Sequence, residues 1–425
     1  MPATPTLPEV TELLDHLFRR ESGRLVAILT RHFGVQHLHL AEDVVQDALV
    51  RAMQTWPFTG VPQNPSAWLL QTAKNRAIDH TRRGTLWRGK QPELVPLMED
   101  CLQSALTTEA PHFEDEISDS QLRMMFVCGH PGLPVEAQVA LTLKTLCGFG
   151  EREIAAAFLI TEPAVTKRLV RARQYLREAG VAVELPPAAE LAPRVDMVLQ
   201  ALYLLFNEGY KASQGDSLLR THLVTEAIRL AELLIAHPLG DRPATRALLA
   251  LMYLNAARLP ARTDGDGGLL VLAEQDRARW DQAGIRRGLR HLAASSTGAV
   301  VTRYHLEAGI AACHGLAPSF AETDWKQIVT LYDLLFELDA SPIVALNRAV
   351  AVAQVSGHRA GLEALDQIKN RAALENYHLL HSVTGQLWFD AGEKAKAAMC
   401  FRRALELAAL PAERVLLEKR LAQCR

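Results

Sequence analysis

Apolar residues along this chain recur with helical spacing almost everywhere. Near the start they lie three and four positions apart, at Leu14, Leu17, Phe18, Leu25, Ile28 and Leu29. Because an α-helix turns once every 3.6 residues, this spacing gathers them on one face. We find no convincing run of alternating apolar and polar residues, which is the pattern of a half-buried strand. The pattern therefore predicts an all-α fold.

The length of 425 residues predicts two to four domains at about 150 residues each. Hydrophobic residues make up 49% and charged residues 22%, which is typical of globular proteins and excludes wholesale disorder, collagen-like repeats and coiled-coil rods. The helical pattern is interrupted at Leu185, Pro186 and Pro187, and a section rich in Ala and Leu follows. We therefore expect a domain boundary near residue 181 and a large helical domain over residues 181–425.

Cysteine usage and hydropathy indicate a cellular compartment. No apolar stretch approaches the roughly 18 residues needed to span a bilayer, and the start lacks a basic segment followed by an apolar one. The six Cys residues lie far apart without a CxxC pair, which is typical of reduced thiols. These features predict a cytoplasmic protein.

The net charge is only −2, but residues of like charge are clustered in separate segments of the chain. Residues 66–90 hold six Lys or Arg and one acid, residues 91–120 hold eight acids and no Lys or Arg, and residues 163–177 hold five Lys or Arg and no acid. An acidic segment with several prolines cannot easily pack a core. We predict an acidic linker over residues 91–120 between helical domains at 1–90 and 121–180.

The far end of the chain carries an internal repeat. Val350, Gly357, Ala360 and Leu362 are followed 35 residues later by Gly385, Gly392, Ala395 and Ala397. The spacing resembles that of tetratricopeptide repeats, whose period is about 34 residues. We expect paired helices there, with small residues at their contacts.

Residues 66–83 form a predicted helix with an inner and an outer face. Leu69, Leu70, Ala73 and Ala77 fall on one side, and Trp68, Gln71, Asn75, Asp79 and Arg82 on the other, flanked by Arg76 and Arg83. An aromatic ring, amides and cations suit stacking on an unpaired base and binding of phosphates. A solvated helix whose Trp68 packs on a neighbour explains the pattern equally well.

A second predicted helix, residues 42–53, has an acidic outer face. Val44, Val45, Ala48, Leu49, Ala52 and Met53 form the inner side, and Glu42, Asp43, Gln46 and Asp47 are expected to be exposed. A basic partner surface would relieve the repulsion among the carboxylates, although an ordinary solvated face explains them too.

Residues 151–177 predict a helix, a short turn and a second helix. Thr161 can cap the second helix, and Pro163 suits its first turn. Val165, Leu169, Ala172 and Leu176 form its inner face, which leaves Lys167, Val170, Arg171, Gln174 and Arg177 outward with Thr166 and Arg173 beside them. Helix-turn-helix proteins lay such a helix in the major groove, so we favour DNA binding over a plain surface helix.

In this order, the motifs resemble the extracytoplasmic function (ECF) sigma factors of the sigma-70 class. The sequence 41–48 is similar to the family's region 2 helix, 65–83 to its promoter-opening helix, and 151–177 to region 4. The extension after residue 181, with Leu205-Phe206-Asn207-Glu208-Gly209-Tyr210 near its start, is similar to the subgroup with a C-terminal tetratricopeptide-like domain.

The resemblance implies roles for individual residues. It implies docking on core RNA polymerase through Glu42, Asp43, Gln46 and Asp47. It implies recognition and melting of the downstream promoter element by the loop from Trp56 to Ser66 and by Trp68, Asn75, Arg76, Arg82 and Arg83. It implies recognition of the upstream element by Thr166, Lys167, Arg168, Arg171 and Arg173.

These expectations combine into a sigma factor that binds core polymerase and promoter DNA. No nucleophile-and-base motif, nucleotide-binding glycine motif or zinc-binding motif is present, so we expect neither an enzyme nor a cofactor or metal. The C-terminal domain is expected to regulate activity by contacting the sigma domains or another protein. A tetratricopeptide-type scaffold and a conventional helix-turn-helix regulator remain the alternatives.

Overall fold

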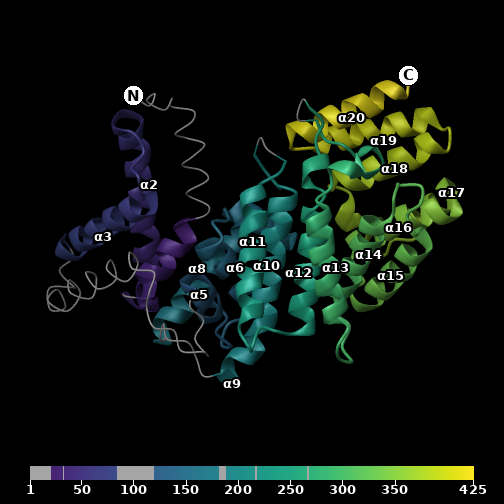
Figure 1. The fold of residues 1–425 in the computed structure, drawn as a ribbon. Coiled ribbons are helices and arrows are strands. Elements are labelled where there is room, and N and C mark those ends of the chain that lie inside the picture. The colour runs from purple at the N-terminus through teal and green to yellow at the C-terminus, as the bar shows by residue number, and fades with distance from the viewer. Residues whose placement is uncertain (1–20, 32, 84–118, 181–187, 216–217, 266–267) are drawn as a thin grey trace. The chain divides into compact units, whose positions relative to one another are not determined.

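The computed structural model describes residues 21–31, 33–83, 119–180, 188–215, 218–265 and 268–425, without the side chains of 80–83 and 188. The prediction of an all-α fold is confirmed, since these residues form helices and no strand beyond an isolated bridge between Thr263 and Leu269 (Figure 1). Within the same residues, no helix combines the length and the apolar character needed to cross a membrane.

The chain divides into two compact units. The first comprises residues 1–205 and 225–240, and the second comprises residues 206–224 and 241–425. The division falls inside α10 (Val195–Tyr210), later than the predicted boundary near 181. The first part of α10 packs in the first unit, where Thr142 donates a hydrogen bond to the Met197 sulfur at 3.8 Å. The domain ranges drawn from the sequence remain predictions.

The first unit contains two groups of helices that carry the predicted sites. In the first group α2 packs against α3; in the second, α8 packs against α6 and α7. The elements of the first unit are η1 (Val35–His37), α2 (Leu38–Thr59), α3 (Pro65–Arg83), α5 (Ser120–Cys128), α6 (Val135–Leu146), α7 (Glu151–Phe158), α8 (Glu162–Glu178), α9 (Ala188–Leu191), η3 (Ala192–Arg194) and most of α11 (Thr221–Ala236).

The predicted acidic linker lies outside the described residues except at its end. Asp119 caps α5, because its carboxylate accepts hydrogen bonds from the Gln121 and Leu122 N–H groups at 2.9 Å. The same carboxylate lies 2.8 Å from the Arg229 guanidinium. Asp119 therefore belongs to the folded unit.

Helices of the second unit pack largely in sequence order. The larger helices are α12 (Pro243–Ala256), α13 (Gln282–Ser295), α14 (Arg303–Leu316), α15 (Trp325–Leu338), α16 (Pro342–Ser356), α17 (His358–Asp366), α18 (His378–Asp390), α19 (Lys394–Leu407) and α20 (Pro411–Gln423). Short 3₁₀ helices lie at η4 (Leu259–Ala261), η5 (Leu272–Glu274), η6 (Arg277–Arg279) and η7 (Arg371–Leu374).

Each copy of the 35-residue repeat corresponds to one pair of helices, α16 with α17 and α18 with α19. Gly357 separates α16 from α17 and Gly392 separates α18 from α19, with φ angles of 90° and 84°. This backbone conformation favours glycine. At Gly385 in α18 an added Cβ would lie 2.9 Å from the Phe401 ring of α19, so the missing side chain lets the two helices approach closely.

Candidate nucleic-acid interface

The helix-turn-helix predicted over residues 151–177 is present. The Glu153 side chain accepts a hydrogen bond from the Gly150 N–H at 2.8 Å, which fixes the start of α7. Leu159 adopts the left-handed conformation with φ 53°, so the chain turns there before α8 begins. Thr161 occupies the N-cap of α8, although its side chain makes no capping bond.

The two faces of α8 follow the predicted pattern. Val165, Leu169, Ala172 and Leu176 are all buried. The outward set is exposed, and it comprises Lys167, Val170, Arg171, Gln174 and Arg177. Because the apolar face of α8 is buried in the first unit, the cationic face on the opposite side of the helix points to solvent.

The five residues predicted to bind the upstream element differ in availability. Lys167 and Arg171 are exposed and have no ion pair with any described residue. The Arg168 guanidinium lies over the Phe158 ring at 5.3 Å from its centroid. The Thr166 hydroxyl donates to the Glu151 carboxylate and to the Glu162 carbonyl. Of the five, Lys167 and Arg171 are therefore the most accessible to a phosphate or a base edge.

Arg173 connects the helix-turn-helix to the acidic face of α2. Its Nη2 donates to Glu42 Oε1 at 2.9 Å, and the Thr145 hydroxyl donates to the same oxygen at 2.8 Å. The Arg173 and Glu42 side chains are only 24% and 21% exposed. The prediction that Glu42 is exposed is thus wrong, because a contact between residues 131 positions apart in sequence covers it.

The rest of the acidic face is accessible. Asp43 lies 2.8 Å from His39 Nδ1, one helical turn away, and Gln46 and Asp47 are exposed. Met53, which we predicted to be buried, is 52% exposed. The inner stripe of α2 runs instead through Ala52 to Trp56, whose indole fills the core beside α3.

The faces of α3 also follow the prediction in part. Leu69, Leu70, Ala73 and Ala77 are buried, and Asn75 is exposed. Trp68 is half-buried and meets the Trp56 ring edge-on, with 5.4 Å between the centroids. Arg76 is partly exposed. Arg82 and Arg83 end the helix, and their side chains lie outside the described set.

The loop predicted from Trp56 to Ser66 is shorter in the structure. Residues through Thr59 continue α2, and α3 starts at Pro65, so only residues 60–64 form the loop. Pro57 is compatible with the last turn of α2, since a missing N–H there removes a single helical bond. Gly60, with φ 79°, ends the helix, and Asn64 Oδ1 accepts from the Ala67 N–H at 3.0 Å.

Phe58 is a further aromatic residue beside this loop, and it is not among the residues predicted to bind DNA. Its side chain is 83% exposed, whereas Trp56 is fully buried. Helical periodicity carries this signal, because residues two positions apart are about 200° apart around the axis and cannot share a face. An exposed ring next to a loop and a basic helix is available to stack on a base.

The Cys128 thiol and the His314 imidazole are buried. Burial raises the pKa of the Cys128 thiol to about 12. Burial, followed by the positive charges of Arg258 and Arg277, lowers the pKa of His314 to about 3. In the described part of the chain, no three His, Cys, Asp or Glu side chains are grouped so that they could hold a metal ion.

Three family models match the chain in the same order as its helical groups. The model described as Sigma-70 region 2 matches residues 17–86, and the model described as Sigma-70, region 4 matches residues 124–176. A family of unknown function (DUF6596) matches residues 194–296. The region 2 range contains α2 and α3, and the region 4 range contains α6 and α7 with most of α8.

Two curated proteins are also similar in sequence to this chain. "Uncharacterized protein R00370" of Rhizobium meliloti (strain 1021) is 37% identical over 382 residues, which are 89% of this chain and 88% of that protein. "ECF RNA polymerase sigma factor SigE" of Mycolicibacterium smegmatis is 29% identical over 165 residues, which are 39% of this chain and 60% of that protein. No solved structure matches the chain.

Proposed function

Because the chain belongs to the ECF sigma-70 family, in a form with a C-terminal helical extension, we propose that it directs core RNA polymerase to specific promoters. The family is not an enzyme family, and in this proposal the polymerase performs the chemistry. The observation that carries the proposal is the outward cationic face of α8, where Lys167 and Arg171 stand on a helix whose other face is buried.

The proposed role of α8 is to read the upstream promoter element. A helix in the major groove presents its exposed side chains to base edges, and Arg pairs best with guanine. Arg171 is the candidate for a base contact, and Lys167 for a phosphate contact. Arg168 and Arg173 support the helix from its flanks, through Phe158 and Glu42.

The proposed role of the region around α3 is to open the DNA at the downstream element. Unstacking and unpairing a base costs a few kcal/mol, and stacking on an aromatic ring contributes about 1–3 kcal/mol per base. Phe58 offers an exposed ring for this purpose, and Asn75 and Arg76 lie on the neighbouring helix. Trp68 takes part in the packing on Trp56, so Phe58 carries more of the proposed stacking.

The proposed polymerase-binding surface is the acidic face of α2. Asp43, Gln46 and Asp47 reach solvent, whereas Glu42 is paired with Arg173. Glu42 can therefore join a polymerase contact only after this pair opens.

Run-off transcription with purified core polymerase tests the proposal. We expect a promoter-dependent transcript from the full chain and none from core polymerase alone. A tetratricopeptide-type scaffold or a conventional repressor gives no such transcript, so its absence would remove the sigma assignment.

The same assay tests the role of Phe58. We expect Phe58→Ala to reduce transcription from a closed duplex about fivefold or more, since about 1–3 kcal/mol of stacking is lost. A template already unpaired at the downstream element should restore the transcript. If the loss is the same on both templates, Phe58 does not act in opening.

We further propose that the C-terminal extension sets the activity of the sigma domains. Residues 1–240 contain the whole first compact unit, so they can be compared with the full chain. The yield of run-off transcript should differ between the two. Equal yield together with equal affinity for core polymerase would dismiss a regulatory role.

A further inference from the structure

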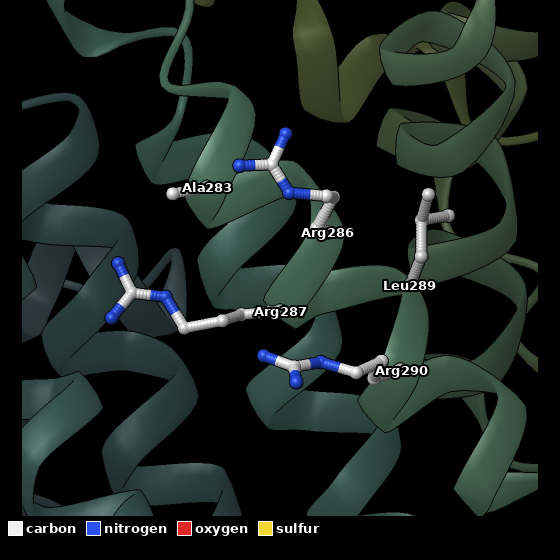
Figure 2. A pocket seen from close by; sticks show the side chains of 5 residues that line it. All are labelled: Ala283, Arg286, Arg287, Leu289 and Arg290. Carbon is white, nitrogen blue, oxygen red and sulfur yellow. The ribbon is translucent and has the colours of Figure 1, made fainter.

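Helix α13 of the second unit carries a dense group of cations. Arg286, Arg287 and Arg290 are exposed, and with Ala283 and Leu289 they line a hollow beside the helix (Figure 2). No Asp or Glu occurs within the helix, and the nearest acid in sequence is its N-cap, Asp281. In Figure 2 the Arg287 and Arg290 side chains extend to the same side, and Arg286 reaches over the space above them.

Two of these guanidinium groups lack a counter-charge. Arg287 lies over the Tyr253 ring at 4.9 Å and 3.8 Å from the Asp281 carboxylate. Arg286 and Arg290 form no ion pair with any residue that the structure describes. Several other arginines of the same unit are paired closely with acids, as in the pairs Arg246–Asp241 at 2.6 Å, Arg348–Asp333 at 2.5 Å and Arg371–Asp366 at 2.7 Å.

Packing on α12 holds this face outward. Ile285 and Gly288 are buried on the opposite side of α13. A Cβ added at Gly288 would lie 2.7 Å from Leu254 Cγ, so the two helices are in close contact. The helix therefore cannot rotate to hide its arginines without losing this packing.

We propose that the α13 arginine face, Arg286, Arg287 and Arg290, binds the phosphate backbone of DNA without reading its sequence. Arg286 and Arg290 are about 6 Å apart along the helix axis. One DNA strand presents a phosphate every 3.4 Å of its axis, so both can reach neighbouring phosphates. The planar guanidinium group binds phosphate through two parallel hydrogen bonds.

The composition of the face favours DNA over an acidic protein. Protein interfaces are usually centred on aromatic and apolar anchors. Here Leu289 is only partly exposed and Ala283 is small, so guanidinium groups dominate the exposed surface. The proposed function has two DNA contacts, at α8 and near α3, and this inference adds a third. It rests on the proposed function, because a sigma factor is brought to DNA.

Salt-dependent binding of the full chain to a labelled duplex of random sequence tests this inference. Each phosphate contact adds about −0.9 to the slope of log K against log salt concentration. Arg286→Ala with Arg290→Ala should therefore make the slope shallower by about 1.8, and weaken binding by up to about 60-fold at 0.1 M salt. The matched control is Arg359→Ala with Arg402→Ala, which removes the same charge from exposed positions of the same unit. The control should bind as the unchanged chain does.

Three results would overturn the inference. They are unchanged binding by the α13 variant, an equal loss in the control variant, and absence of any DNA binding by the unchanged chain. Weaker binding to core polymerase with unchanged DNA binding would assign the face to an acidic protein instead. The ratio of promoter binding to random-sequence binding distinguishes a failure of this inference from a failure of the proposed function. The α13 variant should keep this ratio, whereas Lys167→Ala with Arg171→Ala should lower it.

Discussion

Replacing Lys167 and Arg171 together by alanine is expected to abolish most promoter-dependent transcription by this sigma factor. Both side chains are exposed on α8 and have no ion pair with the described residues, so their loss removes the proposed DNA contacts and breaks no ion pair in the described part of the chain. The lost phosphate contact of Lys167 would make the salt slope of promoter binding shallower by about 0.9, and weaken binding up to about 8-fold at 0.1 M salt. A lost bidentate contact from Arg171 to guanine would add about 1–3 kcal/mol and relax the preference for one base pair.

The measurement is binding of the polymerase holoenzyme to promoter and random duplexes at several salt concentrations. Arg359→Ala with Arg402→Ala changes the net charge equally and should leave both affinities unchanged. Circular dichroism of the Lys167 and Arg171 variant should show its helical content intact, because the buried face of α8 is untouched. An unchanged ratio of promoter to random binding would remove α8 as the recognition helix.

Replacing Glu208 by alanine is expected to cause the largest loss of stability. Glu208 and Arg220 form a buried pair at 2.8 Å, with side chains 6% and 11% exposed. The carboxylate also accepts from the Ser213 N–H at 3.1 Å, and Arg220 Nη2 donates to the Gln214 carbonyl at 2.8 Å. The pair thus holds the connection between α10 and α11 in place. Its disruption removes the carboxylate that faces a largely buried guanidinium, which costs about 3–5 kcal/mol.

Urea unfolding followed by circular dichroism measures this effect. Glu406→Ala is the matched control, because it breaks an exposed Glu–Arg pair of the same 2.8 Å length and should cost at most about 1 kcal/mol. Arg220→Ala should resemble Glu208→Ala, and the double variant should lose less than the sum of the two. Equal effects of Glu208→Ala and Glu406→Ala would show that burial adds nothing to this pair.

Periodicity alone predicted the buried apolar residues of α8 and α3. Val165, Leu169, Ala172 and Leu176 share one face of any α-helix formed by that segment, whatever packs against it. The same reasoning located the turns inside the helix pairs α16–α17 and α18–α19, because a repeated glycine, here Gly357 and Gly392, marks a repeated turn. Sequence periodicity is therefore sufficient to predict burial where it depends only on the apolar face of one helix.

Other features depended on residues far apart in the chain. Met53 and Trp56 both suit an inner position of α2, and only the packing against α3 selects Trp56. Phe58 follows from that choice, since it faces away from Trp56. The carboxylate of Glu42 is paired with Arg173, a contact that no local pattern in either helix indicates.

The amino-acid sequence by itself determined that this protein is all-α, where its helix-turn-helix lies and which face of the second helix is cationic. The spacing of apolar residues at 3.6 positions is a local property, so the buried face of a helix can be predicted from its own segment. Tertiary structure decided which of the predicted binding residues remain accessible: Lys167 and Arg171 do, whereas Glu42, Arg168 and Arg173 are engaged within the chain. Ion pairs and ring contacts act over a few ångströms in space, and sequence distance carries no information about them.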